Sequence, residues 1–239
     1  IDKGLFDVNN TDLRRKVRRR ENRKKSGPTL KVDKTCHVGR TYADFEMYQE
    51  KHPDMNICEM DTVEGRRGGK VILTIFFRNC DLQLMYLREA NTAESVTRVF
   101  NHLRNILKAD FGKIFPVLLC DRGTEFSNPD AIEMNIETGE LGAQVFYCDP
   151  QQTNQKSRCE RNHEYIRYIL PKRTAFDHLT QDDINLVMNN VNSMPRASLN
   201  VKAPIQLFVE LYGSETARRL GLEYIPLEQL CLKPELLKK

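Results

Sequence analysis

The chain has 239 residues and a formal net charge of +4, which allows one large domain or a core with extensions. No apolar run approaches the ~20 residues of a membrane helix, and the mixed, then basic, start is unlike a signal peptide. Seven cysteines without a Cys-x-x-Cys pair favour a reduced, intracellular protein over a disulfide framework or a zinc finger. Because the chain begins at Ile1 without a methionine, we expect a fragment of a longer protein.

Positive charge is concentrated at the start of the chain. Residues 1–40 hold thirteen Lys and Arg against five Asp and Glu, so residues 41–239 carry a net charge of −4. The run 13–25 contains nine cations and cannot build a core of its own. It is either a solvated linker or an arm that binds the phosphates of a nucleic acid. The arm residues for which we predict DNA binding are Arg14, Arg15, Lys16, Arg18, Arg19 and Arg20.

Residues 41–107 are predicted to form a helix, three strands and a second helix. Thr41-Tyr42-Ala43-Asp44 is typical of a capping box and predicts a short helix to about Gln49. Apolar alternation and short turns predict strands at 56–62, 71–78 and 82–89, joined as an antiparallel meander. The cap sequence at 91–94 then opens a helix whose apolar residues fall on one face.

The second half predicts alternating strands and helices. Residues 114–120 are apolar without alternation, as in a strand buried on both faces, and 143–148 predict a further strand. Helices are expected from about Glu160 to the stop at Pro171, and then at 181–194, from Pro204, and at 215–220. The order β-β-β-α-β-α-β-α predicts an α/β, RNase H-like fold: a mixed five-stranded sheet flanked by helices.

Three regions are expected from this pattern. Residues 1–50 would form a basic N-terminal arm and a short helix, residues 51–176 the RNase H-like core, and residues 177–239 a helical C-terminal tail.

Three acidic residues lie where these elements begin or end. Asp61 and Asp121 end apolar, strand-like runs, and Glu160 opens an amphipathic helix. A fold that gathers the three builds a site of oxygen donors, which suits Mg²⁺ or Mn²⁺. Two such ions roughly 3.5–4 Å apart can activate an attacking oxygen and stabilise a leaving oxygen at phosphorus. The sequence therefore predicts phosphoryl transfer on a nucleic-acid backbone.

Two of these acids have competitors nearby. Glu59 and Glu64 flank Asp61; alternation places Glu59 on the same side as Asp61 but deeper in the strand, and Glu64 lies in a Gly-rich turn. Glu164 lies one helical turn after Glu160 and faces the same side of the helix. We favour Asp61 and Glu160.

The neighbouring basic residues have structural alternatives as well. Arg122 could be an ion-pair partner of Asp121, which would make that acid structural. Lys156 and Arg158 flank the glutamate and either bind phosphates of the DNA end or are ordinary solvated cations. His163 is interpreted as a surface or capping histidine rather than a general base.

Several ordered motifs resemble one family of enzymes. The residues are Asp121-Arg122-Gly123-Thr124-Glu125-Phe126, Cys148-Asp149-Pro150-Gln151-Gln152, Gln155-Lys156 and Glu160. They resemble the second half of the catalytic core in DDE transposases and retroviral-type integrases, in particular the insertion-sequence-thirty family of bacterial transposases. The likeness covers roughly residues 50 to 213 and includes the motifs at 169–174 and 199–204.

The resemblance implies a function and its partners. Asp61, Asp121 and Glu160 would be the catalytic, metal-binding residues of a cytoplasmic, nucleoid-associated bacterial transposase. It would cleave transposon ends with two Mg²⁺ or Mn²⁺ ions and join the freed 3′-hydroxyl to target DNA, acting as a homo-oligomer and without a membrane. The alternatives are an RNase H-like nuclease that does not join strands, and a catalytically silent DNA-binding derivative of a transposase.

The chain also departs from the family pattern. Thirty-eight residues separate Asp121 from Glu160, somewhat more than is usual, and we assign the excess to a surface insertion at 128–140. Ser157 stands where a glycine is common, and Arg161-Asn162-His163 replaces an Asn-rich pattern. These changes concern the loop and the DNA contacts rather than the metal chemistry.

Overall fold

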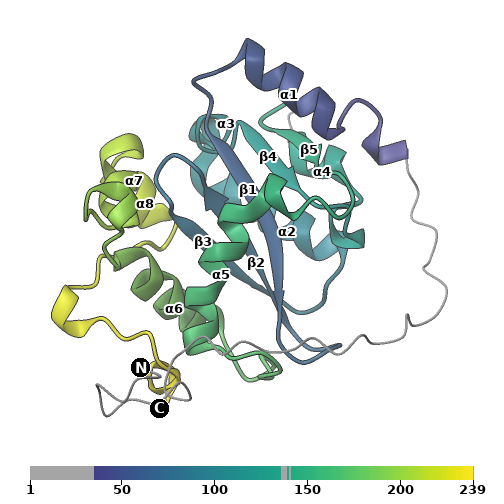
Figure 1. The fold of residues 1–239 in the computed structure, drawn as a ribbon. Coiled ribbons are helices and arrows are strands. Elements are labelled where there is room, and N and C mark those ends of the chain that lie inside the picture. Colours follow the sequence, from purple (N-terminus) through teal and green to yellow (C-terminus); the bar gives the residue numbers. More distant parts are fainter. Residues whose placement is uncertain (1–34, 136–138, 140, 239) are drawn as a thin grey trace, which may run out of the picture. The chain divides into compact units, whose positions relative to one another are not determined.

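The computed structural model describes residues 35–135, 139 and 141–238, all of which belong to one compact unit, Val32–Lys239 (Figure 1). Its centre is a five-stranded sheet in the order β3-β2-β1-β4-β5. The strands are β1 (Ile57–Glu64), β2 (Val71–Phe77), β3 (Gln83–Arg88), β4 (Val117–Cys120) and β5 (Gln144–Tyr147). Strands β1 to β3 are antiparallel, whereas β4 is parallel to β1 and β5 to β4. This mixed sheet confirms the predicted RNase H-like fold.

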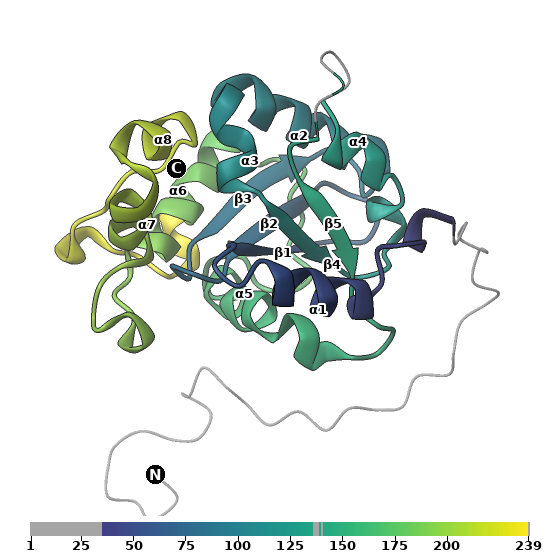
Figure 2. The same ribbon diagram turned by 90° about the horizontal axis from the view of Figure 1, so that it is seen from above.

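Helices cover both faces of the sheet. They are α1 (Tyr42–Lys51), α2 (Ala93–Leu107), α3 (Phe111–Ile114), α4 (Pro129–Glu133), α5 (Ser157–Ile169), α6 (Gln181–Ser193), α7 (Pro204–Tyr212) and α8 (Ser214–Arg219). Helices α2, α3 and α4 lie on one face and α1 and α5 on the other, while α6, α7 and α8 lie beside β3 (Figure 2). Among the described residues, no helix combines the length and the hydropathy that crossing a membrane requires.

Most helix boundaries follow caps that are visible in the sequence. Thr41 forms a capping box with Asp44 at the start of α1, and Thr180 forms the same motif at the start of α6. Thr92 caps α2, and Pro204 is the first residue of α7. A hydroxyl cap satisfies backbone N–H groups that have no partner inside the helix, which is why these helices begin where predicted.

Strand β1 is buried on both sides and separates two apolar clusters. Cys58 and Met60 belong to the large cluster, which includes residues of α2 and α3. Ile57 belongs to a smaller cluster under α1, where Phe45 contacts Phe146 with their ring centroids 5.7 Å apart. The alternation predicted for this strand is confirmed, and it assigns Glu59 and Asp61 to the α5 side of the sheet.

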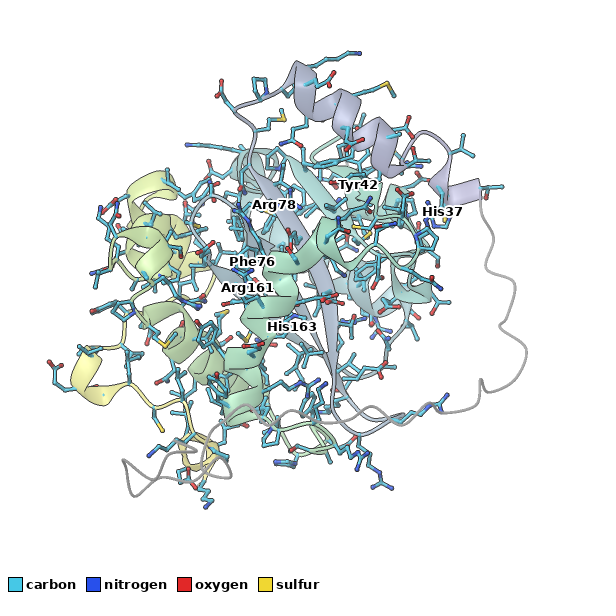
Figure 3. All side chains as sticks on the ribbon, in the orientation of Figure 1. His37, Tyr42, Phe76, Arg78, Arg161 and His163 are labelled. Carbon is cyan, nitrogen blue, oxygen red and sulfur yellow. The ribbon has the colours of Figure 1, made fainter. Side chains whose placement is uncertain are left out.

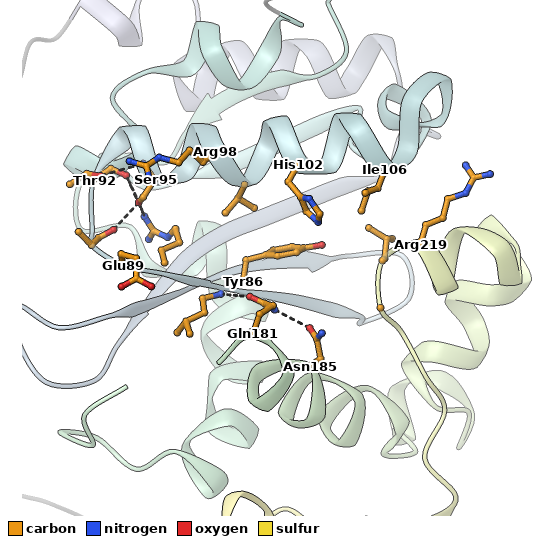
Figure 4. A pocket seen from close by; sticks show the side chains of 16 residues that line it. Tyr86, Glu89, Thr92, Ser95, Arg98, His102, Ile106, Gln181, Asn185 and Arg219 are labelled. Carbon is orange, nitrogen blue, oxygen red and sulfur yellow. Dashed lines mark hydrogen bonds between the residues drawn. The ribbon is translucent and has the colours of Figure 1, made fainter. Parts of the chain in front are cut away.

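The free edge of β3 is paired with amide side chains of α6. Asn192 accepts from the Gln83 N–H at 2.9 Å and donates to the Gln83 carbonyl at 2.8 Å. Gln181 accepts from the Leu87 N–H at 2.8 Å and donates to the Met85 carbonyl at 3.1 Å, as well as to Asn185 (Figure 4). An edge strand otherwise exposes a row of unpaired backbone groups, so these side chains act in place of a sixth strand.

Two details of the predicted fold are wrong. The strand expected at 114–120 begins at Val117, because Phe111–Ile114 forms helix α3 and buries Ile114 as a helical residue. A short apolar run does not distinguish a buried strand from a buried helix. The stretch 128–140 is not wholly a surface insertion, since Ile132 and Glu133 of α4 are buried. Glu133 is fixed there by ionic hydrogen bonds from Arg40, at 3.0 and 2.6 Å.

The predicted domain boundaries stay predictions. Helix α1, which was assigned to the N-terminal region, packs on the sheet through Phe45. Residues of α6, α7 and α8 extend the apolar cluster of the sheet rather than forming a separate one. The predicted DNA-binding residues of the arm, at 14–20, lie outside the described residues.

Candidate active site

The register between two parallel strands brings Asp61 and Asp121 together. Ile57 pairs with Val117 and Glu59 with Leu119, an offset of sixty residues. Continuing this register by one pleat places Asp61 beside Asp121, on the same face of neighbouring strands about 4.8 Å apart. Asp61 lies within β1 but beyond its last pair with β4, and Asp121 follows the last residue of β4. The pairing between β1 and β4 therefore ends just before the position where the two carboxylates meet.

The ammonium group of Lys156 lies between these carboxylates. Its Nζ is 3.2 Å from Asp61 Oδ1 and 3.4 Å from Asp121 Oδ2, and it donates to the Met60 carbonyl at 2.9 Å. The Lys156 side chain is only 6% exposed. Burial acts to lower the pKa of Lys156, but Asp61 and Asp121 together raise it above its ordinary value. Lys156 is therefore charged, and one cation is shared by two carboxylates.

This geometry fits a divalent cation. Two carboxylates that converge on a positive charge offer oxygen ligands of the kind that Mg²⁺ and Mn²⁺ prefer. Among the described residues, however, the group whose ligand atoms all lie within 4.8 Å of one another is Asp61, Cys159 and His163. The oxygens of the three predicted acids are thus not all within that distance. Asp61 and Asp121 are brought together around Lys156 Nζ, whereas Glu160 lies in the first turn of α5 and is exposed.

Glu160 lies in the first turn of α5, the helix that packs against β1. Lys156 and His163, which precede and follow it at helical spacing, both contact Asp61. At about 100° per residue, Glu160 falls on the same side of α5 as these two residues. It is exposed, and no other described residue donates a hydrogen bond or forms an ion pair with it. Its carboxylate is therefore free to bind a ligand beside Asp61.

Glu59, a competitor for the role of Asp61, has a structural task. Its side chain is 1% exposed, and its Oε1 accepts from Arg78 Nε at 2.7 Å. Its Oε2 accepts from the backbone N–H of Cys159, in the first turn of α5, at 2.8 Å. The N-cap residue of α5 makes no side-chain cap, so Glu59 supplies one from β1. Glu59 thereby fixes α5 on the sheet, two residues away from Asp61.

His163 contacts Asp61, which the sequence analysis did not anticipate. The expectation of a surface histidine is wrong, because the side chain is 15% exposed and its Nδ1 lies 3.8 Å from Asp61 Oδ2. Its Nε2 is 2.9 Å from the Thr74 hydroxyl, which also donates to the Asp61 carbonyl at 3.1 Å. Figure 3 shows His163 on α5. Burial lowers the pKa of His163 to about 4, against the pull of Asp61, so the ring is neutral near pH 7. Its position at the third residue after Glu160 was the available signal.

The loops around Asp121 are held by hydrogen bonds. Asp121 Oδ1 accepts from the Gly123 N–H at 2.9 Å, which turns the chain directly after β4. Arg122 pairs with Asp149 at 3.3 Å, so the reading in which it neutralises Asp121 finds no support. Gln155 accepts from the Asp149 N–H at 2.7 Å and so ties the loop after β5 to the start of α5.

The other predicted residues have clear positions. Glu64 is exposed and accepts a hydrogen bond from Asn91 at 3.4 Å, and this asparagine also donates to Glu125 at 3.2 Å. Arg158 is exposed and donates to the Arg78 carbonyl at 3.2 Å. Lys156, which was predicted to bind DNA, points inward to the carboxylates; its contact with DNA stays a prediction.

The sheet topology and this edge define a class of protein. The sheet has the mixed five-stranded order predicted for an RNase H-like core, with Asp61 and Asp121 at the same edge of two neighbouring parallel strands. Comparison with known proteins agrees with the class, although no family model matches the chain.

The relatives of the chain are an integrase and insertion-sequence transposases. It is 31% identical over 153 residues to a putative integrase, ORF3, of Spiroplasma virus SpV1-R8A2 B, covering 64% of this chain and 45% of that protein. It is 33% identical over 90 residues to the transposase InsI of insertion sequence element IS30A of Escherichia coli, covering 38% of this chain and 22% of that protein. The transposase of element IS1086 of Cupriavidus metallidurans is 29% identical over 101 residues, covering 42% and 28%. The predicted resemblance to this family is confirmed.

These matches cover less than half the length of each relative. Among solved structures, the catalytic core domain of BIV integrase is 18% identical, covers 64% of this chain and 93% of that chain, and has a TM-score of 0.45.

Proposed function

We propose that the chain is the catalytic core of a DNA transposase that cleaves transposon ends and joins the freed 3′-hydroxyl to target DNA. The observation that carries the proposal is the convergence of Asp61 and Asp121 on one cation, Lys156 Nζ, beside the helix that bears Glu160. The names of the relatives, an integrase and insertion-sequence transposases, support the same activity.

Asp61, Asp121 and Glu160 are the proposed metal ligands. Asp61 and Asp121 are supported by the register of β1 with β4, and the start of α5, which bears Glu160, is fixed by Glu59. When bound, two Mg²⁺ or Mn²⁺ ions would activate the attacking oxygen and stabilise the leaving oxygen of a phosphodiester. His163, whose Nδ1 lies 3.8 Å from Asp61 Oδ2, is neutral near pH 7 and so does not neutralise the charge of Asp61. Because two bound metal ions would activate the attacking water, no protein base is needed.

The partners follow from the reaction. The substrates are double-stranded DNA at transposon ends and at target sites, and a homo-oligomer would hold two ends together. A bacterial cytoplasm, in contact with the nucleoid, is the proposed compartment.

Strand joining separates this proposal from its alternatives. The test uses end-labelled oligonucleotides that carry the sequences flanking the chain's own gene, incubated with Mg²⁺ or Mn²⁺ and an unlabelled target duplex. We expect both a cleaved strand and a longer joined product. Cleavage without joining would indicate an RNase H-like nuclease, and binding without cleavage would indicate a silent DNA-binding derivative.

A further inference from the structure

A groove rich in arginine lies on the other side of α5 from Asp61. It has a volume of about 650 Å³ and is lined by the end of β2, by α5 and by the loop that follows α6. Its four arginines are Arg78, Arg158, Arg161 and Arg196, and the one acidic residue in its lining is Asp81. Figure 3 shows Phe76, Arg78 and Arg161 where β2 ends beside α5.

The helix separates the groove from the candidate active site. Arg158, Arg161 and Tyr165 line the groove at helical spacing. At about 100° per residue, Arg161 is turned by about 100° from Glu160 and Arg158 by about 160°. One polyanion that crosses the first turns of α5 can therefore contact the groove and approach Glu160 from the other side, across a helix about 10 Å wide.

The positive charge of the groove is only partly compensated. Arg78 is paired with the buried Glu59. Asp81 accepts a hydrogen bond from Ser198 at 2.8 Å. Among the described residues, no carboxylate lies within ion-pair distance of Arg158, Arg161 or Arg196. Formal charges in the lining sum to +3, whereas residues 41–239 as a whole carry −4.

Arg196 is the most buried of these cations. The residue is 8% exposed, and its guanidinium carbon lies 4.0 Å from the ring centroid of Tyr165. It donates to the Val191 carbonyl at 3.2 Å, but its Nε is buried without a hydrogen-bond partner. Asp81 attracts the Arg196 guanidinium without forming an ion pair with it. Burying a charge that lacks an ion-paired anion is costly, and an anion in the groove would offset that cost.

We propose that this groove binds the phosphodiester backbone of the DNA that flanks the cleaved phosphate. The proposal rests on the proposed function for the identity of the anion, and on the groove for its position. Guanidinium groups bind phosphate oxygens through paired N–H donors, and a groove of this volume is larger than a single phosphate needs. Arg158 and Arg161 supply exposed donors, while Arg196 supplies charge at the base of the groove.

DNA affinity at several salt concentrations tests the groove. Full-length protein is titrated against a fluorescent nonspecific duplex in EDTA, as wild type, Arg158→Ala, Arg161→Ala and the double variant. Each exposed arginine that contacts a phosphate should reduce the slope of log K against log[NaCl] by about 0.9, and the double variant by about 1.8. Each single change should also weaken binding roughly fivefold to tenfold. Arg196 is left unchanged because its buried side chain supports the fold.

The matched control is Arg98→Ala. Arg98 is exposed, as Arg158 and Arg161 are, but pairs with Glu94 on α2. For this variant we expect the slope of log K against log[NaCl] to equal that of the wild type. The Tm of every variant should stay within a few degrees of the wild-type value. Groove variants with the slope of the control, or a wild type that does not bind duplex DNA, would overturn the proposal. Weakened self-association with an unchanged DNA slope would overturn it too, since the groove would then receive an acidic segment of a second copy.

The groove and the proposed function can fail separately. Binding in EDTA does not depend on metal-assisted cleavage. A change of slope in the groove variants without any cleavage by the wild type would therefore support DNA binding by the groove and contradict the proposed catalytic activity. Cleavage by the wild type together with unchanged slopes would contradict DNA binding by the groove alone. Repeating the titration with a duplex from the flanking sequences of the gene shows whether the bound backbone belongs to the transposon end or to target DNA.

Discussion

Lys156 Nζ lies 3.2 Å from Asp61 Oδ1, and the same ammonium reaches Asp121 at 3.4 Å. A cation that neutralises two carboxylates in the absence of metal must compete with any metal that uses the same oxygens. The two aspartates are thus kept close together without a bound ion, and the competition can be measured.

Replacing Lys156 by Gln should strengthen the effect of metal on stability. Without metal, the variant should lose about 1–3 kcal/mol, because Asp61 and Asp121 lose their shared cation and the Met60 carbonyl its donor. With saturating Mn²⁺, the stabilisation should exceed that of the wild type by at least about 1 kcal/mol, or about 2–4 °C in Tm. Thermal unfolding in EDTA and in Mn²⁺ measures both, with the exposed Lys172→Gln as control. If Mn²⁺ raised the Tm of the wild type and of the variant by the same amount, the metal would bind elsewhere.

Glu59→Ala should destabilise the protein and separate α5 from the sheet. The change leaves Arg78 without its carboxylate and the first turn of α5 without its cap. Breaking a buried pair of this kind costs about 3–5 kcal/mol. Urea unfolding gives the free energy, and Glu64→Gln, an exposed neighbour, is the control. Loss of less than 1 kcal/mol would show that Glu59 does not hold the helix.

The sequence predicted the acids but not the contacts that arrange them. Asp121 was predicted because an apolar strand ends at it, and Glu160 because an amphipathic stretch follows the motif Gln155-Lys156. The task of Glu59 was not recognisable, since its partners, Arg78 and Cys159, are 19 and 100 residues away. Long-range pairs of this kind leave no periodicity in a single sequence.

The same limit applies to the inward position of Lys156. A lysine at the start of a polar helix is usually solvated, and its burial follows from two carboxylates, Asp61 and Asp121, that lie 95 and 35 residues earlier in the chain. His163 was misjudged for a similar reason, because its neighbours Asp61 and Thr74 come from β1 and β2. The positions of most strands along the chain were predictable, because each strand carried its own apolar pattern and flanking turn.

Asn192→Ala should be among the most destabilising changes outside the site. Asn192 is fully buried, and its amide is the partner of both backbone groups of Gln83. Leaving a buried donor and a buried acceptor unsatisfied costs about 1–3 kcal/mol each, so we expect a loss of about 2–5 kcal/mol. Asn105→Ala, at an exposed position of α2, should be neutral or slightly stabilising. An Asn192→Ala variant as stable as the wild type would contradict the pairing of α6 with the edge of β3.

Two of the seven cysteines should react with a thiol reagent in the native protein. Cys36 and Cys231 are partly exposed, whereas the other five are buried, and none of the seven forms a disulfide. Burial raises the pKa of Cys148 to about 11 and that of Cys80 to about 12, so their thiols stay protonated at pH 8. The number of thiols that react with Ellman's reagent should be two before denaturation and seven after it. Rapid reaction of four or more in the native state would contradict the described packing.

The most direct test of the central claim is single-turnover cleavage of end-labelled DNA by wild type, Asp61→Asn, Asp121→Asn and Glu160→Gln, with DNA binding measured on the same samples in Ca²⁺. Each substitution removes a proposed metal ligand at little cost in shape. We expect Mg²⁺- or Mn²⁺-dependent cleavage by the wild type, a loss of at least about 100-fold in each variant, and DNA affinity within about twofold of the wild type. Wild-type cleavage that persists in EDTA, or full activity in any one of the three variants, would contradict the account.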